Sequence, residues 1–132
     1  MSGRQVTGGC ACGEVRVTAI GEPDRVGICH CSDCRKHHGA LFYAAAILPE
    51  RAVTIEGQTR SYQGRHFCPI CGSSVFAQTG DEIEVHLGAL DTPDEFVPEY
   101  ELWTVRREAW LPSFPVKERF FKGRDGEDCG GT

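Results

Sequence analysis

Seven of the eight cysteines fall into three tight groups, and their spacing constrains the fold more than any other feature. The groups are Cys10-x-Cys12, Cys29-x-Cys31-x2-Cys34 and Cys68-x2-Cys71. Cysteines a few residues apart on a tight turn can chelate one ion, and zinc prefers tetrahedral sets of thiolate and imidazole ligands. The spacing therefore predicts two bound zinc ions per chain.

The first and last groups can together form one closed site. Each group supplies two thiolates, and four is the ligand number of a structural zinc. Glycine directly follows the second cysteine of each pair, where the backbone can turn sharply and aim its N–H groups at sulfur. Such a site would join the beginning of the chain to its middle. The predicted ligands are Cys10, Cys12, Cys68 and Cys71.

The middle group is the candidate for function. Cys29, Cys31 and Cys34 lie within six residues and can hold one face of a tetrahedron. Three interpretations remain: His37 or His38 closes the site, the fourth position stays open to water or substrate, or the thiols form a metal-free redox cluster. We expect the open position.

Other residues near this group are weaker candidates for binding metal or substrate. His30 lies between two ligands, so its side chain should point away from the metal. Cys129 lies in an acidic, glycine-rich tail and is not expected to be a ligand. The basic and polar residues Arg35, Lys36, His37 and His38 could bind a substrate carboxylate or move a proton, while the alternative is a solvated helical turn.

An open zinc with three thiolates favours thiol chemistry. Three thiolates on Zn²⁺ leave a net charge of about −1, which weakens its Lewis acidity and its ability to activate water. It should still take an exchangeable thiol, because metal binding deprotonates a coordinated thiol. We hypothesise that the site presents a small substrate thiol to a carbonyl compound.

The rest of the sequence predicts a small, mostly β domain with little helix. Its 132 residues suit one domain, and 16 glycines with a single methionine favour strands and turns. A short helix is expected over residues 33–38, capped by Ser32 and ended by Gly39. Antiparallel strands are expected over residues 15–20, 41–48, 53–55, 74–79, 83–87 and 102–106.

Composition excludes several partners and favours the cytosol. A formal charge of −5 is a poor match for phosphate backbones, so no nucleic acid is expected. No window approaches the roughly 18 apolar residues of a membrane span. The first residues lack the apolar core of a signal peptide, and the reducing cytosol keeps thiols available for metal.

Residues 8–16, 29–36 and 67–73 resemble the glutathione-dependent formaldehyde-activating enzyme family, which also includes centromere protein V. The segment 98–112, with Trp103 and Trp110, is similar to that family's closing strand and the tryptophan after it. The resemblance spans about residues 4–120. One departure is Ala40, where many members have serine.

The resemblance implies a β-tent fold of antiparallel sheets. We expect a single domain over residues 4–122, followed by a flexible tail over 123–132, because that last stretch is rich in Gly, Asp and Glu. The resemblance also implies a structural zinc on the four outer cysteines and a catalytic zinc on the middle three. The implied reaction adds glutathione to formaldehyde, giving S-hydroxymethylglutathione, so the enzyme would be a carbon–sulfur lyase in the reverse direction. The alternative from a different class is a non-enzymatic zinc scaffold that binds a protein.

Overall fold

Two β-sheets form the framework of the chain. The structure is a computed structural model, and it describes residues 4–124. The smaller sheet is antiparallel and has the strand order β1-β2-β5. Its strands are β1 (Gln5–Gly9), β2 (Arg16–Ile20) and β5 (Val53–Glu56).

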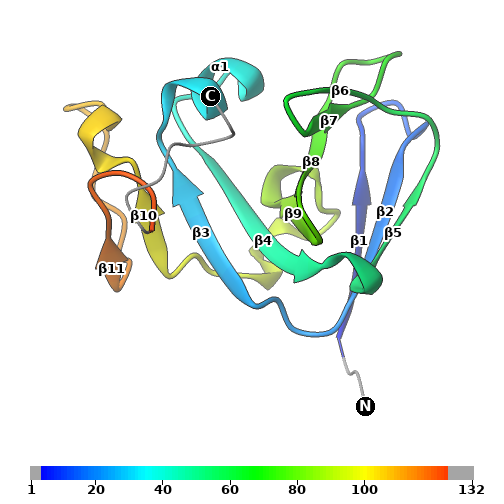
Figure 1. Cartoon of the computed structure of the whole chain (residues 1–132), viewed down its shortest axis with the longest axis horizontal. Coiled ribbons are helices and arrows are strands. Elements are labelled where there is room, and N and C mark those ends of the chain that lie inside the picture. Colours follow the sequence, from blue (N-terminus) through cyan, green and yellow to red (C-terminus); the bar gives the residue numbers. More distant parts are fainter. Residues whose placement is uncertain (1–3, 125–132) are drawn as a thin grey trace.

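The larger sheet has eight strands in the order β11-β10-β3-β4-β9-β8-β7-β6. Figure 1 shows β3 and β4 crossing the centre of the molecule, with β10 and β11 at one end and the smaller sheet at the other. The strands are β3 (Arg25–Cys29), β4 (Tyr43–Pro49), β6 (Arg60–Tyr62), β7 (Arg65–Phe67), β8 (Ser74–Thr79), β9 (Glu82–His86), β10 (Tyr100–Leu102) and β11 (Glu118–Arg119).

Helical structure is limited to short segments. The helix α1 (Ser32–His38) lies between β3 and β4, and Gly39 ends it in the left-handed conformation at φ 67°. Its N-cap is Cys31, whose sulfur accepts the Cys34 N–H at 3.3 Å, so the predicted Ser32 cap is wrong by one residue. None of the described helices is long and apolar enough to cross a membrane. The 3-10 turns are η1 (Glu50–Ala52), η2 (Leu87–Ala89), η3 (Pro93–Glu95) and η4 (Thr104–Arg106).

The mostly β prediction is confirmed, with two corrections. The strand predicted over residues 102–106 ends at Leu102, because Trp103 adopts φ 61° and the chain continues into η4. The sheets are also not wholly antiparallel, since β10 runs parallel to both β3 and β11. The predicted tail begins at Gly123 and lies outside the described residues after Arg124, so the domain boundary stays a prediction.

Apolar alternation builds the main core between the sheets. On β2, Val17 and Ala19 are buried while Thr18 between them is partly exposed. The main cluster joins side chains of both sheets, among them Val17, Leu48 and Val85. A second, separate cluster contains the three middle cysteines and one tryptophan, with two residues packed against them: Cys29, Cys31, Cys34, Trp103, Tyr43 and Leu102.

Gly27 allows the closest approach between β3 and β10. It pairs with Tyr100 in the parallel ladder. A Cβ atom at Gly27 would overlap the Tyr100 ring, which is itself buried. The glycine thus lets an aromatic side chain lie flat against β3 and hold β10 in register.

We predict that Gly27→Ala destabilises the fold by about 1–3 kcal/mol, because the Tyr100 ring must move to admit the new methyl group. Urea unfolding followed by circular dichroism measures the change. The matched control is Gly88→Ala, where an added Cβ meets nothing within 4 Å. Equal stabilities of the two variants would contradict this account of the β3–β10 contact.

Candidate metal centres and their pocket

The four outer cysteines come together in the structure. Their Sγ atoms all lie within 4.8 Å of one another. The first pair follows β1, and the second pair lies in the turn between β7 and β8, so the group connects the two sheets. The members are Cys10, Cys12, Cys68 and Cys71.

Backbone N–H groups point at these sulfurs. The Val15 N–H donates to the Cys10 Sγ at 3.2 Å, and the Ile70 N–H donates to the Cys68 Sγ at 3.3 Å. Such donors stabilise a thiolate more than a thiol. Backbone donors within or just after each cysteine pair therefore favour deprotonation of the sulfurs.

Without a bound cation, the thiols of this group differ in pKa. Hydrogen bonds from Ser73 and from the Cys12 backbone lower the pKa of Cys71 to about 5. A backbone hydrogen bond from Glu14 lowers the pKa of Cys12, but partial burial and the neighbouring thiols outweigh it and raise that pKa to about 12. Four sulfurs this close cannot all carry charge unless a cation balances them.

The three middle cysteines form a second group at the junction of β3 and α1. Their Sγ atoms also lie within 4.8 Å of one another, and all three residues are buried. Cys29 ends β3, Cys31 caps α1, and Cys34 lies in the first turn of α1, with 3.5 Å between the sulfurs of Cys29 and Cys34. Within residues 4–124, neither His37 nor His38 belongs to this group.

His30 takes part in a different network. Its Nε2 lies 2.8 Å from the Glu101 Oε2, and both side chains are fully buried. The Glu101 carboxylate also pairs with Arg119 at 3.1 Å and with Arg107 at 3.4 Å. The expectation that His30 turns away from the metal agrees with this contact, whereas Glu101 was not anticipated from the sequence.

The polar residues of α1 divide into pocket and surface positions. Lys36 is exposed, and Arg35 pairs with Glu108 at 3.7 Å, which favours the solvated-turn interpretation for both. His38 instead stacks on Tyr43, with ring centroids 4.5 Å apart. Burial, helped by the charges of neighbouring His37 and Arg65, lowers the pKa of His38 to about 4, so this imidazole is neutral at pH 7.

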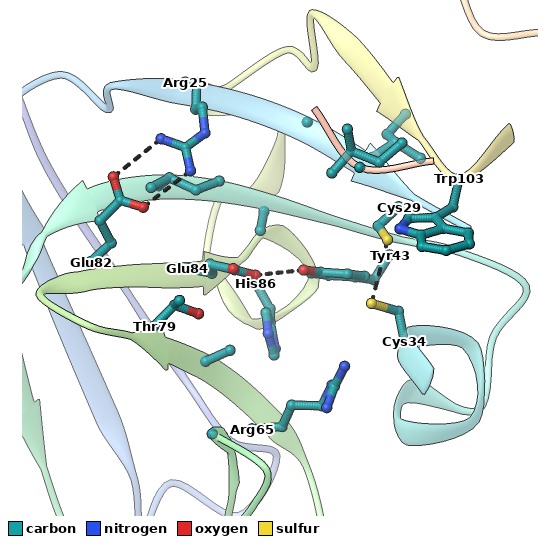
Figure 2. A pocket seen from close by; sticks show the side chains of 18 of the residues that line it. Arg25, Cys29, Cys34, Tyr43, Arg65, Thr79, Glu82, Glu84, His86 and Trp103 are labelled. Carbon is teal, nitrogen blue, oxygen red and sulfur yellow. Dashed lines mark hydrogen bonds and ion pairs between the residues drawn. The ribbon is translucent and has the colours of Figure 1, made fainter. Parts of the chain in front are cut away.

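A cavity of about 610 Å³ lies inside the curve of the larger sheet. Cys29 and Cys34 line it, but none of the four outer cysteines does. Figure 2 shows Arg25 and Glu82 at one end of the pocket and the two cysteines with Trp103 at the other. Its volume is within the range of sites for small molecules.

Charged and hydrogen-bonding groups line the pocket. Arg25 makes a two-point contact with Glu82, at 3.1 and 3.2 Å. Tyr43 donates its hydroxyl hydrogen to the Glu84 carboxylate at 2.5 Å. Burial raises the pKa of Glu84, and burial together with the Glu84 charge holds the pKa of Tyr43 well above its ordinary value.

The sequence of this chain matches a known family. The family model described as glutathione-dependent formaldehyde-activating enzyme matches residues 5–106, well over half of the chain. The chain belongs to this family. The matched region contains all seven clustered cysteines, so the resemblance drawn from their motifs is confirmed.

A solved structure supports the fold. The chain is similar to the crystal structure of a Rhodobacter sphaeroides protein from a structural genomics project, with a TM-score of 0.52 and 24% identity. The alignment covers 70% of this chain and 97% of that chain. At this identity the likeness concerns the fold alone. No curated protein matches the chain.

The family match ends before two partners of the buried Glu101. Arg107 and Arg119 both contact this carboxylate and both lie after residue 106. The described segment that follows the match therefore packs against the His30–Glu101 pair. It connects the end of the described chain to the loop that carries the three middle cysteines.

We predict that Glu84→Gln stabilises the fold at neutral pH. The folded pKa of Glu84 lies above its unfolded value, so ionisation costs stability as pH rises through the folded pKa. A glutamine avoids this cost and can still accept the Tyr43 hydrogen bond. The gain over wild type, measured by urea unfolding, should be larger at pH 7.5 than at pH 5.

The control for this comparison is Glu118→Gln, at an exposed position on β11. Its stability difference from wild type should not change between the two pH values. A gain for Glu84→Gln that is the same at both pH values would contradict the assignment of a raised pKa to Glu84.

Proposed function

We propose that this chain is a zinc enzyme that joins a small thiol, with glutathione as the first candidate, to formaldehyde or a related small carbonyl compound. In the reverse direction it is a carbon–sulfur lyase. Membership of the glutathione-dependent formaldehyde-activating enzyme family supports this reaction class. The observation that carries the proposal is that the pocket reaches the three-cysteine group and not the four-cysteine group.

Both groups fit zinc by the chemistry of their donors. Soft thiolates in a four-member set are typical of closed structural zinc sites, which we assign to the outer cysteines. Three protein ligands with access from a pocket are typical of catalytic zinc sites, which we assign to Cys29, Cys31 and Cys34. Zinc bound there would keep a coordinated substrate thiol deprotonated at neutral pH.

The proposed reaction is balanced without any further reactant. The thiol sulfur forms a bond to the carbonyl carbon, and the π electrons of the carbonyl move to its oxygen. The proton lost by the thiol finishes on that oxygen, giving a hydroxymethyl thioether. We assign this step to the end of the pocket lined by Cys29 and Cys34, and the burial of both residues supports a step that is shielded from bulk water.

The pocket walls suit a substrate with charges of both signs. Arg65 and Glu84 face the same cavity, and the Arg65 charge acts on the Glu84 carboxyl. Glutathione carries two carboxylates and one ammonium group, so it can use both kinds of wall residue. We propose that these walls hold the remote part of the thiol substrate.

The partners in this proposal are small molecules, and the proposed compartment is the cytosol. A protein-binding zinc scaffold would not need a cavity that leads to a second group of thiols. We therefore place the scaffold second, as the outcome to be distinguished by experiment.

We predict that Cys31→Ser lowers the zinc content from two ions to one per chain and reduces thiol–formaldehyde condensation by at least about 100-fold. The fold should survive, because the four-cysteine group is intact. Metal analysis, circular dichroism and exchange NMR of glutathione with formaldehyde give the three measurements.

Two further variants complete this experiment. Cys68→Ser removes a fully buried member of the four-cysteine group and should cause global unfolding. Cys129→Ser, at a position outside the described residues, is the matched control and should leave zinc content and activity unchanged. Unfolding of Cys31→Ser would instead favour a structural role for both ions, and unchanged activity of a folded Cys31→Ser chain would refute the enzyme proposal.

A further inference from the structure

Trp103 adopts a backbone conformation that its residue type disfavours. Its φ and ψ are 61° and 43°, and among the described non-glycine residues only Gln63 and Trp103 have positive φ. Bulky residues are rarely found in this region of backbone space, so the surrounding structure must impose the conformation. The Trp103 N–H donates to the Lys122 carbonyl at 2.9 Å, which pins the backbone at this point.

The left-handed turn carries the indole ring to the three-cysteine group. Trp103 is 8% exposed and packs in the same cluster as Cys29, Cys31 and Cys34. It also lines the pocket. Figure 2 shows the indole nitrogen on the edge of the ring that faces Cys29 and Tyr43.

The indole N–H is a buried donor that lacks an acceptor within the described part of the chain. Among residues 4–124, no group accepts a hydrogen bond from Trp103 Nε1. A buried donor that lacks an acceptor destabilises the folded state, because folding removes its hydrogen bond to water without replacing it. Trp103 therefore has both an unfavourable backbone conformation and an unsatisfied buried donor, and it lines the pocket. This combination points to a ligand that accepts the missing hydrogen bond.

The nearby Tyr43 hydroxyl does not provide an equivalent donor. A tyrosine has one hydroxyl hydrogen, and Tyr43 donates it to Glu84 at 2.5 Å. The indole of Trp103 can only donate, so it cannot compete with the thiols for a metal or attack a carbonyl compound. It is suited to contact an oxygen without reacting.

We propose that Trp103 Nε1–H binds the oxygen atom of the carbonyl substrate and of the hydroxymethyl product. This inference rests on the proposed function and names the residue that recognises the oxygen. As the carbon–sulfur bond forms, negative charge develops on that oxygen, and a fixed N–H donor is most effective there. The indole keeps its proton throughout, and the proton that ends on the oxygen is the one released by the thiol.

The test compares two ligands that differ by one oxygen. S-Hydroxymethylglutathione, prepared from glutathione and formaldehyde, carries the hydroxyl, and S-methylglutathione does not. Trp103→Phe should raise the Kd of the hydroxymethyl compound about tenfold and leave the Kd of S-methylglutathione within about twofold of wild type. It should also lower kcat for condensation without changing KM for glutathione.

The matched control is Trp110→Phe, at a tryptophan that is 72% exposed. It should leave both Kd values unchanged. Because the chain has two tryptophans, this variant also leaves Trp103 as the single indole fluorophore. Its emission should shift with the hydroxymethyl compound and not with S-methylglutathione, which tests the contact even if Trp103→Phe does not fold.

The outcomes separate this inference from the proposed function. Equal weakening of both ligands in Trp103→Phe, or equal emission shifts in Trp110→Phe, would overturn the oxygen contact and leave Trp103 a packing residue. Failure of the zinc-loaded wild-type chain to bind either ligand or to accelerate condensation would overturn the proposed function and this inference with it.

Discussion

The mutual repulsion of thiolates is the constraint on which this structure depends. Four sulfurs within 4.8 Å of one another connect the turn after β1 to the turn between β7 and β8. Without a cation, ionisation of one thiol opposes ionisation of its neighbours: hydrogen bonds from Ser73 favour the Cys71 thiolate, whereas desolvation and the neighbouring thiols raise the pKa of Cys12. A bound cation would turn the same closeness into attraction and fix the two sheets relative to each other.

A second constraint places the candidate active site at the other end of the larger sheet. The parallel pairing of β3 and β10 sets Glu101 opposite Ile28 and Leu102 opposite Cys29. Glu101 then reaches His30, and Trp103, the residue after Leu102, packs its indole against the three-cysteine group. The short β3–β10 ladder therefore positions both the charge network around Glu101 and the indole N–H of Trp103, which has no acceptor among the described residues.

The sequence was informative wherever the signal was local. Cysteine spacing predicted both groups that the structure assembles, and alternating apolar residues predicted strands such as β2 and β5. It was uninformative where a contact joins distant segments. His30 and Glu101 are 71 positions apart, and the Tyr43–Glu84 hydrogen bond spans 41, so both depend on strand register that no local pattern encodes.

The strand predicted over residues 102–106 is wrong beyond Leu102, where residue preferences and the observed backbone conformation differ. Leu102, Trp103 and Val105 alternate with polar residues in part and favour a strand by propensity. A continued strand would send successive side chains to opposite faces of the sheet. The left-handed turn at Trp103 instead holds its ring against the thiols, at a cost in local stability. Metal bound to the four outer cysteines would stabilise the framework elsewhere, and a small domain could then tolerate a strained residue beside its second cysteine group.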